Sequence, residues 1–261
     1  MPLVQRNGLT FHSQVLGEGE PVCLLHGLLV GSLATWYFGA APRLAKKRKV
    51  LVYDLRGHGQ SERAPTGYGL SSMADDLDAM LEDFAPPGGP KVTLVGHSYG
   101  ALVALHFALL QPGRVARLAL IEAPLPPWRV DEVGDLSADG PDQMLKALPP
   151  TLADSVRRGG RAAGRLVDRL RFLMTESSLS KDLAQETGFN LTPSSPLMKA
   201  LPSLKMPVLC LYGSRSSCRP VGEKLARAIR GAQLKIVEGG HFLPAEAPQA
   251  LADELERFLD G

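Results

Sequence analysis

Short apolar runs alternate with amphipathic stretches along most of the chain. The runs have the length of strands and lie at residues 22–25, 50–53, 92–95, 115–121, 207–213 and 233–237. Between them, apolar residues recur at helical spacing, as in the segment that follows Ser71 and Ser72. Strands and helices that alternate in this way predict an α/β fold, with a mainly parallel sheet covered by helices on both faces.

Two parts of the chain depart from this rhythm. Residues 9–16 alternate polar and apolar and are followed by a turn at 17–21, which predicts an early antiparallel hairpin. From residue 126 to 203 no strand pattern appears, and glycine, proline and short helical segments dominate. We therefore expect a core formed by residues 1–125 and 204–261, with a helical cap inserted at 126–203.

Two charged stretches are expected to face water. Ser71 and Ser72 are candidate N-cap residues of a helix with an apolar face that includes Met73 and Leu77 and a solvated acidic face that includes Asp76. The basic run at 46–49 directly precedes a strand, which predicts a solvated turn.

The pentapeptide Gly-His-Ser-Tyr-Gly at 96–100 lies between a strand-like run and a helix-like run. A serine placed there occupies a sharp turn, and glycines two residues before and after it let neighbouring backbone pass without a Cβ clash. Such a turn exposes the Ser98 hydroxyl and sets the Tyr99 amide at a helix N-terminus, which favours an anion. The pattern indicates a nucleophile elbow rather than a solvated serine in a glycine-rich connection.

The loops after two other strands carry further candidate chemistry. Gly27 follows a buried strand and would aim the Leu28 amide inward as a second oxyanion donor, while His26 is interpreted as a loop-bracing side chain rather than a catalytic one. His241 follows the last strand on a glycine-rich loop, which favours it as the general base for Ser98. The bracing interpretation also applies to the remaining loop and helix histidines, His58, His97 and His106, and to Asp54 and Arg56.

These motifs together resemble the α/β-hydrolase superfamily. The segments that carry the resemblance are 26–27, 54–61, 96–100 and 239–242, and the match spans nearly the whole chain outside the cap. It implies an α/β-hydrolase fold with an eight-stranded, mostly parallel sheet, a lid after the sixth strand, and a serine, acid, histidine triad in that order. Ser98, His241 and the Leu28 and Tyr99 amides match the family's nucleophile, base and oxyanion donors.

The acid of the triad departs from the family pattern. Most members carry an aspartate after the seventh strand, but here Ser216 stands at that place and no carboxylate lies between Gly213 and Val221. Some members supply the acid after the sixth strand, where this chain has Glu122. Either the triad is incomplete or Glu122 fixes the tautomer of His241, and we favour Glu122 as the acid.

The predicted cap offers two further candidates. Trp128 and Phe172, with many leucines, suggest an apolar acyl pocket, although the same residues suit a cap core. The cap is also rich in arginine, and Arg161, Arg165 and Arg169 recur at a spacing of four. They form either a docking face for an acyl-carrier or coenzyme A thioester or a solvated helix face, and the solvated face is favoured.

Composition narrows the classes of function. A net charge of +2 argues against a strongly basic surface that would bind nucleic acid, and no apolar run reaches membrane-spanning length. The N-terminus lacks the layout of a signal peptide, so a cytoplasmic location is expected. The three cysteines are scattered, which argues against a disulfide framework, and no metal-ligand or cofactor motif is present in the sequence.

The sequence therefore predicts a serine hydrolase that cleaves a carboxylic ester or thioester through a Ser98 acyl-enzyme, with no metal or organic cofactor. The resemblance leaves open an acyltransferase or a carbon–carbon bond hydrolase or lyase with the same triad. It also leaves open a non-catalytic ligand receptor, an alternative supported by the missing aspartate after the seventh strand.

Overall fold

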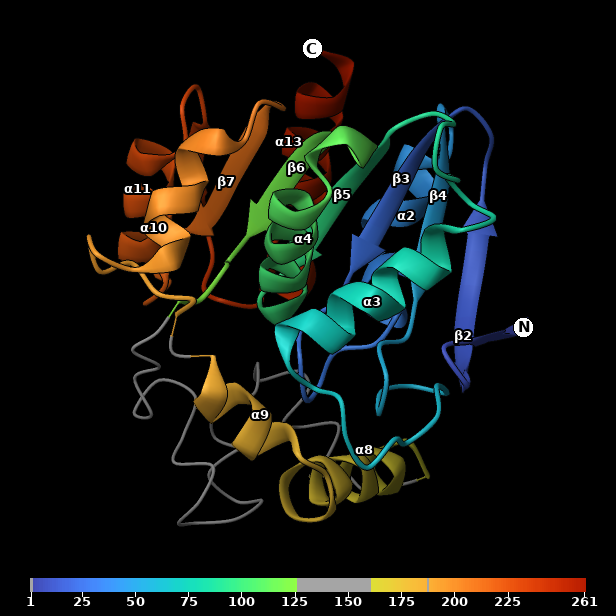
Figure 1. Ribbon diagram of the computed structural model, residues 1–261. Coiled ribbons are helices and arrows are strands. Elements are labelled where there is room, and N and C mark those ends of the chain that lie inside the picture. Colours follow the sequence, from blue (N-terminus) through green and yellow to red (C-terminus); the bar gives the residue numbers. More distant parts are fainter. Residues whose placement is uncertain (1, 126–160, 187) are drawn as a thin grey trace.

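A computed structural model describes residues 2–125, 161–186 and 188–261 of the chain. Its centre is an eight-stranded sheet in the order β1-β2-β4-β3-β5-β6-β7-β8 (Figure 1). The strands are β1 (Leu3–Arg6), β2 (Leu9–Leu16), β3 (Glu20–Leu25), β4 (Arg48–Tyr53), β5 (Val92–His97), β6 (Val115–Ile121), β7 (Val208–Gly213) and β8 (Gln233–Val237). The strand β2 pairs antiparallel with both β1 and β4, and the other pairings are parallel, so the sheet is mostly parallel, as the sequence predicts.

Helices cover both faces of this sheet (Figure 1). The helices in the described residues are α1 (Ala34–Tyr37), α2 (Ala40–Leu44), α3 (Leu70–Leu81), α4 (Tyr99–Leu110), α8 (Arg161–Arg171), α9 (Leu179–Gln185), α10 (Pro196–Ala200), α11 (Arg219–Ala228), α12 (Leu243–Glu246) and α13 (Pro248–Asp260), with the short helical segments η1 (Pro112–Arg114), η2 (Phe172–Glu176) and η3 (Leu201–Ser203). One face packs against α3, α4 and α11, and the other packs against α1, α2 and α13.

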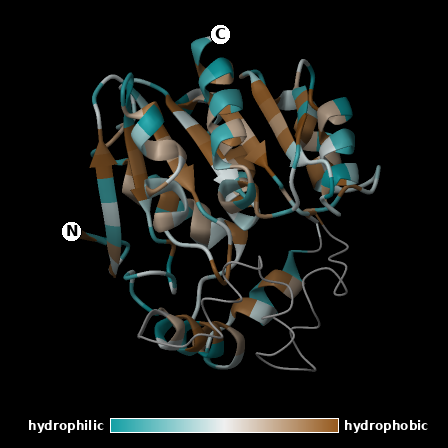
Figure 2. Ribbon diagram, turned by 180° about the vertical axis from the view of Figure 1, so that it is seen from behind, coloured by the Kyte–Doolittle hydropathy of each residue, from teal (hydrophilic) through white to brown (hydrophobic). Residues whose placement is uncertain are grey.

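The strands form two cores because successive side chains point to opposite faces. In β3, Cys23 and Leu25 join the core beneath α3 and α4, while Val22 and Leu24 join the core beneath α2 and α13. Continuous apolar runs are therefore needed in the inner strands, which Figure 2 shows as hydrophobic ribbons between helices with polar outer faces. This requirement explains why the runs located the strands so well.

One helix boundary differs from the prediction, and two other helical segments are interrupted. The helix α3 begins at Leu70 with Gly69 at its N-cap, so Ser71 and Ser72 lie in its first turn and do not cap it. Between Ala34 and Leu44 the chain forms two short helices, α1 and α2, instead of one. The last helical segment is broken between α12 and α13, and Pro248, whose missing N–H suits the first position of a helix, begins α13.

Two charged groups expected in solvent are buried. The carboxylate of Asp76 is 2% exposed and accepts hydrogen bonds from the Arg56 Nε (2.6 Å) and Nη2 (2.7 Å), because α3 packs beside the loop after β4. In the basic run, Arg48 is buried and pairs with Asp260 on α13 at 2.6 Å. Both pairs join segments far apart in the sequence.

The segment from α8 to α9 lies beyond the carboxyl ends of the parallel strands (Figure 1). Leu166 and Leu170 of α8 pack against Leu29 and Val30, in the loop after β3, and Leu173 of η2 packs in a cluster with Leu28. This segment falls inside the predicted cap, whose boundaries at 126 and 203 stay a prediction because residues 126–160 are outside the described residues.

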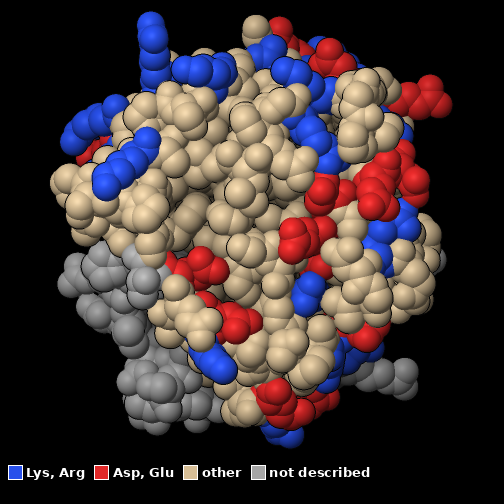
Figure 3. Space-filling model, viewed as in Figure 1, with Lys and Arg blue, Asp and Glu red and all other residues tan. Residues whose placement is uncertain are grey.

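The outer surface carries charges of both signs. Lysine and arginine lie beside aspartate and glutamate on the face drawn in Figure 3, so this face is mixed rather than uniformly basic. No helix in the described ranges has the length and apolar character needed to cross a bilayer.

We expect Asp76→Asn to lower the free energy of unfolding by about 3 kcal/mol, because it leaves the Arg56 guanidinium buried without its carboxylate partner. Urea denaturation followed by circular dichroism measures this change. Asp75→Asn, at an exposed position one residue away, is the matched control and should stay within about 0.5 kcal/mol of the wild type. Equal stability of the two variants would contradict the assignment.

Candidate active site

Ser98 lies at the turn between β5 and α4 in a strained backbone conformation. Its φ is 53° and its ψ is −123°, in the left-handed half of the map that non-glycine residues seldom occupy. The flanking glycines are required by close backbone approach: a Cβ at Gly96 would lie 2.3 Å from the Gly100 carbonyl oxygen, and a Cβ at Gly100 would lie 2.5 Å from the His26 carbonyl oxygen. The chain thus forms the sharp strand-to-helix turn that its sequence predicts.

His241 reaches Ser98 from the loop between β8 and α12. Its Nε2 lies 3.0 Å from the Ser98 Oγ. The loop is held in two ways: the Glu246 carboxylate accepts hydrogen bonds from the Gly240 and Phe242 amides, and the His97 Nε2–H donates to the His241 carbonyl at 2.8 Å. Burial lowers the pKa of His97 to about 3, so this ring is neutral and serves as a structural donor.

Glu122 follows β6 directly and is fully buried beside His241. Its Oε2 lies 3.3 Å from the His241 Nδ1. The Gly213 amide donates to Oε1, and the Ser216 hydroxyl donates to Oε2. Ser216, which stands where most relatives carry the aspartate, therefore contacts the carboxylate that β6 supplies.

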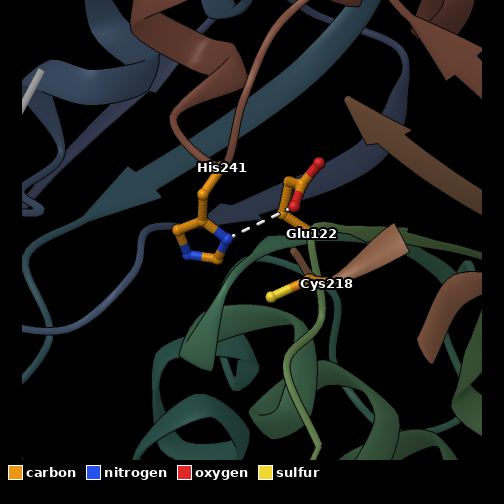
Figure 4. A group of neighbouring side chains, drawn as sticks. All are labelled: Glu122, Cys218 and His241. Atoms are coloured by element: carbon orange, nitrogen blue, oxygen red, sulfur yellow. Dashed lines mark hydrogen bonds and ion pairs between the residues drawn. The ribbon is translucent and has the colours of Figure 1, made fainter. Parts of the chain in front are cut away.

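The environment of His241 favours its protonated form. Burial by itself lowers the pKa of the ring, but the neighbouring Cys218 sulfur and the Glu122 carboxylate outweigh burial and raise the pKa to about 9. Figure 4 shows the three side chains converging, with the contact between Glu122 and His241 marked. Only the neutral ring can take a proton from the Ser98 hydroxyl, so the raised pKa makes the ring a stronger base but moves its activity to higher pH.

The loop after β3 passes close to Ser98. A Cβ at Gly27 would lie 3.0 Å from the Ser98 Cβ, so only glycine allows this approach without displacement. Leu28 follows at once and is partly buried. Within the ranges that the structure describes, neither the Leu28 amide nor the Tyr99 amide donates to a protein acceptor. Both predicted oxyanion donors are therefore available to a ligand.

Buried polar side chains hold this loop in place. The His58 Nε2 accepts from the Leu29 amide at 2.9 Å, and Asp54 accepts from the Leu33 amide at 2.7 Å. His26 accepts from the Leu55 amide at 3.0 Å. Burial lowers the pKa of both His26 and His58 to about 3, so both rings are neutral. These contacts agree with the interpretation of His26, His58 and Asp54 as bracing groups.

Sequence reasoning missed two neighbours of the site, Ser216 as a partner of Glu122 and Cys218 beside His241. The ligand atoms of Glu122, Cys218 and His241 all lie within 4.8 Å of one another. The only signal was position, since Ser216 and Cys218 follow β7 and therefore lie at the same sheet edge as the other strand ends. Nothing in their residue types distinguished them from other loop residues.

The residues predicted to form an acyl pocket or a docking face in the cap have different outcomes in the structure. Phe172 packs with Tyr68 and Leu173, and Trp128 is outside the described residues. Arg165 is exposed on α8, whereas the Arg169 Nη2 turns inward and lies 3.4 Å from the Val30 carbonyl oxygen. The predicted solvated helix face therefore holds for Arg165 but not for Arg169.

Comparison with known proteins gives the family. The model for the alpha/beta hydrolase fold matches residues 20–248. The chain is 31% identical over 219 residues to a pimeloyl-[acyl-carrier protein] methyl ester esterase of Vibrio campbellii, covering 80% of this chain and 82% of that one. It is 26% identical to a soluble epoxide hydrolase of Corynebacterium sp., covering 97% and 94%.

Solved structures give the same fold. The enol-lactonase from Burkholderia xenovorans superimposes with a TM-score of 0.75 at 23% identity and full coverage of both chains. The match of the family model over most of the chain, together with the eight-stranded sheet and its covering helices, shows that this protein belongs to the α/β-hydrolase fold family.

Proposed function

We propose that this hydrolase cleaves a carboxylic ester or thioester through an acyl-enzyme on Ser98. One observation carries the proposal, the continuous contact from the Ser98 Oγ to the His241 Nε2 at 3.0 Å and from the His241 Nδ1 to the Glu122 Oε2 at 3.3 Å. A nucleophile, a base and a group that orients the base are the parts that acyl transfer requires.

The roles follow from the atoms in contact. The His241 Nε2 takes the Ser98 proton while the Oγ attacks the acyl carbon, and the Leu28 and Tyr99 amides stabilise the oxyanion. The imidazolium then protonates the leaving alcohol or thiol, and an ester to Ser98 remains. Water, deprotonated by the same ring, cleaves this ester. Glu122 holds the proton on Nδ1 and stabilises the imidazolium.

A serine nucleophile argues for ester or thioester chemistry over epoxide opening. Attack of Ser98 on an epoxide carbon would leave an ether, which water attacking at a neutral carbon does not release. The relative named as a soluble epoxide hydrolase therefore supports hydrolysis in general, whereas the relative named as a methyl ester esterase supports the ester substrate class. The buried carboxylate at Glu122 also weakens the case for a non-catalytic receptor, which rested on the missing aspartate.

Activated esters and acyl thioesters of increasing chain length should add one acyl group to the protein, and the group should then leave. Intact-mass spectrometry over time measures both steps. Ser98→Ala should show no added mass, because the attacking oxygen is gone. Stable acylation without release would point instead to an acyltransferase without its acceptor, and no acylation of the wild type by any substrate would contradict the proposal.

Glu122→Gln should lower turnover by about 10⁴-fold, the loss that follows when a triad aspartate becomes asparagine in a serine protease. The amide cannot stabilise the imidazolium and favours the wrong tautomer. Glu238→Gln is the matched control, since Glu238 lies on the same loop as His241 but is exposed and pairs with Arg215. A Glu122→Gln enzyme with near-wild-type turnover would show that the acid lies elsewhere.

The rate of acylation should rise with pH towards the pKa of His241, about 9, because only the neutral ring accepts a proton. Removing the Glu122 charge leaves burial, which lowers the pKa, with less opposition, so Glu122→Gln should shift the His241 titration to lower pH. Nuclear magnetic resonance of the ring in the Ser98→Ala background measures this shift without turnover. An unchanged titration would exclude a charged Glu122 as the cause.

A further inference from the structure

Three side chains that can each bind a metal ion, Glu122, Cys218 and His241, lie close together on the side of the His241 ring away from Ser98. Glu122 comes from the end of β6, Cys218 from the N-cap of α11, and His241 from the loop after β8 (Figure 4). Their carboxylate oxygen, sulfur and ring nitrogen all lie within 4.8 Å of one another. Small side-chain rotations bring such atoms to the separations of ligands around one ion, because zinc–ligand bonds are about 2.0–2.3 Å long.

The set of ligand atoms favours one class of ion. A thiolate, an imidazole and a carboxylate form a mixed set that suits Zn²⁺, whereas Mg²⁺ and Ca²⁺ require oxygen ligands. Oε2 of Glu122 accepts from Ser216 and has a second lone pair for a metal. Three protein ligands leave a fourth position for water.

We propose that Glu122, Cys218 and His241 form a zinc-binding site that switches the serine hydrolase off. Binding of the ion to the protonated ring displaces two protons to solvent, one from the Cys218 thiol and one from the His241 Nδ1, which must be bare to bind a metal. The ring proton then sits on Nε2, which faces Ser98 at 3.0 Å. A ring protonated there donates to the Ser98 oxygen and accepts nothing from it, so the nucleophile stays neutral. This inhibitory consequence rests on the proposed function, whereas the binding of the ion does not.

Cys218 is the cysteine in position for this role. Cys23 and Cys210 are buried in the core beneath α3 and α4, and burial raises the pKa of both thiols, that of Cys210 to about 12. Cys218 is partly buried at a helix start, next to the two other ligands. Removal of Cys218 should therefore affect zinc binding, and removal of Cys23 should not.

Binding is tested first, in full-length Ser98→Ala protein, so that the result does not depend on activity. Zinc titration against a chromophoric chelator should give one tightly bound ion per chain. Adding Cys218→Ala should weaken binding at least about tenfold, while Cys23→Ala should leave it unchanged. With Co²⁺ as a probe, a sulfur-to-cobalt charge-transfer band should appear in the parent protein and be absent with Cys218→Ala.

Inhibition is tested in the wild type. Zinc should slow acylation of Ser98 by an activated ester, and a chelator should restore the rate. Absence of a stoichiometric ion, or equal zinc affinity with and without Cys218, would overturn the proposal whether or not the protein is a hydrolase. Zinc bound through Cys218 in a protein that no substrate acylates even after a chelator has removed the ion would support the site and overturn the proposed function.

Discussion

The buried carboxylate of Glu122 is the group on which the arrangement of the site depends. A carboxylate without solvent is stable only when its oxygens are hydrogen-bonded. Here the partners come from three separate places: the Gly213 amide at the end of β7, the Ser216 hydroxyl beyond it, and the ring of His241 after β8. One side chain therefore fixes the relative positions of three strand ends. Its φ of 55° shows that the backbone, too, is held away from ordinary geometry at this point.

Neutral histidines fix the other side of the site. His26, His58 and His97 are buried. His26 and His58 each accept from one backbone amide and donate to one backbone carbonyl, and His97 donates to the His241 carbonyl. A neutral ring can accept at one nitrogen and donate at the other, which no protonated ring can do. This property suits them to loops whose amides must keep a set direction before substrate arrives. Electrostatic stabilisation of an oxyanion depends on that prior orientation.

The sequence predicted those features of the fold that depend on residues close together in the chain. Apolar runs located the inner strands because both faces of each strand are buried, and the glycines around Ser98 reported the sharp turn. Partners that meet only in the folded chain left no such trace. Asp76 reads as a solvated acid until Arg56 is placed beside it, and Arg48 as a solvated base until α13 brings Asp260.

The contacts of Ser216 and Cys218 were hidden for the same reason. Both depend on how β7 and α11 lie relative to Glu122, and the residue types alone carry no record of that arrangement. The absence of an aspartate was visible in the sequence, and so was a carboxylate after β6. What the sequence did not show was that the Ser216 hydroxyl contacts the Glu122 carboxylate and so joins the two positions.

The packing of α8 and η2 on the loop after β3 has a mechanical consequence. Leu166, Leu170 and Leu173 pack against the same few residues, 28–30, that include the predicted oxyanion donor Leu28. Lifting these helices would bare apolar surface and at the same time remove the support of that loop. The apolar contacts that hold these helices beside the strand ends therefore also hold the loop whose Leu28 amide is the predicted oxyanion donor.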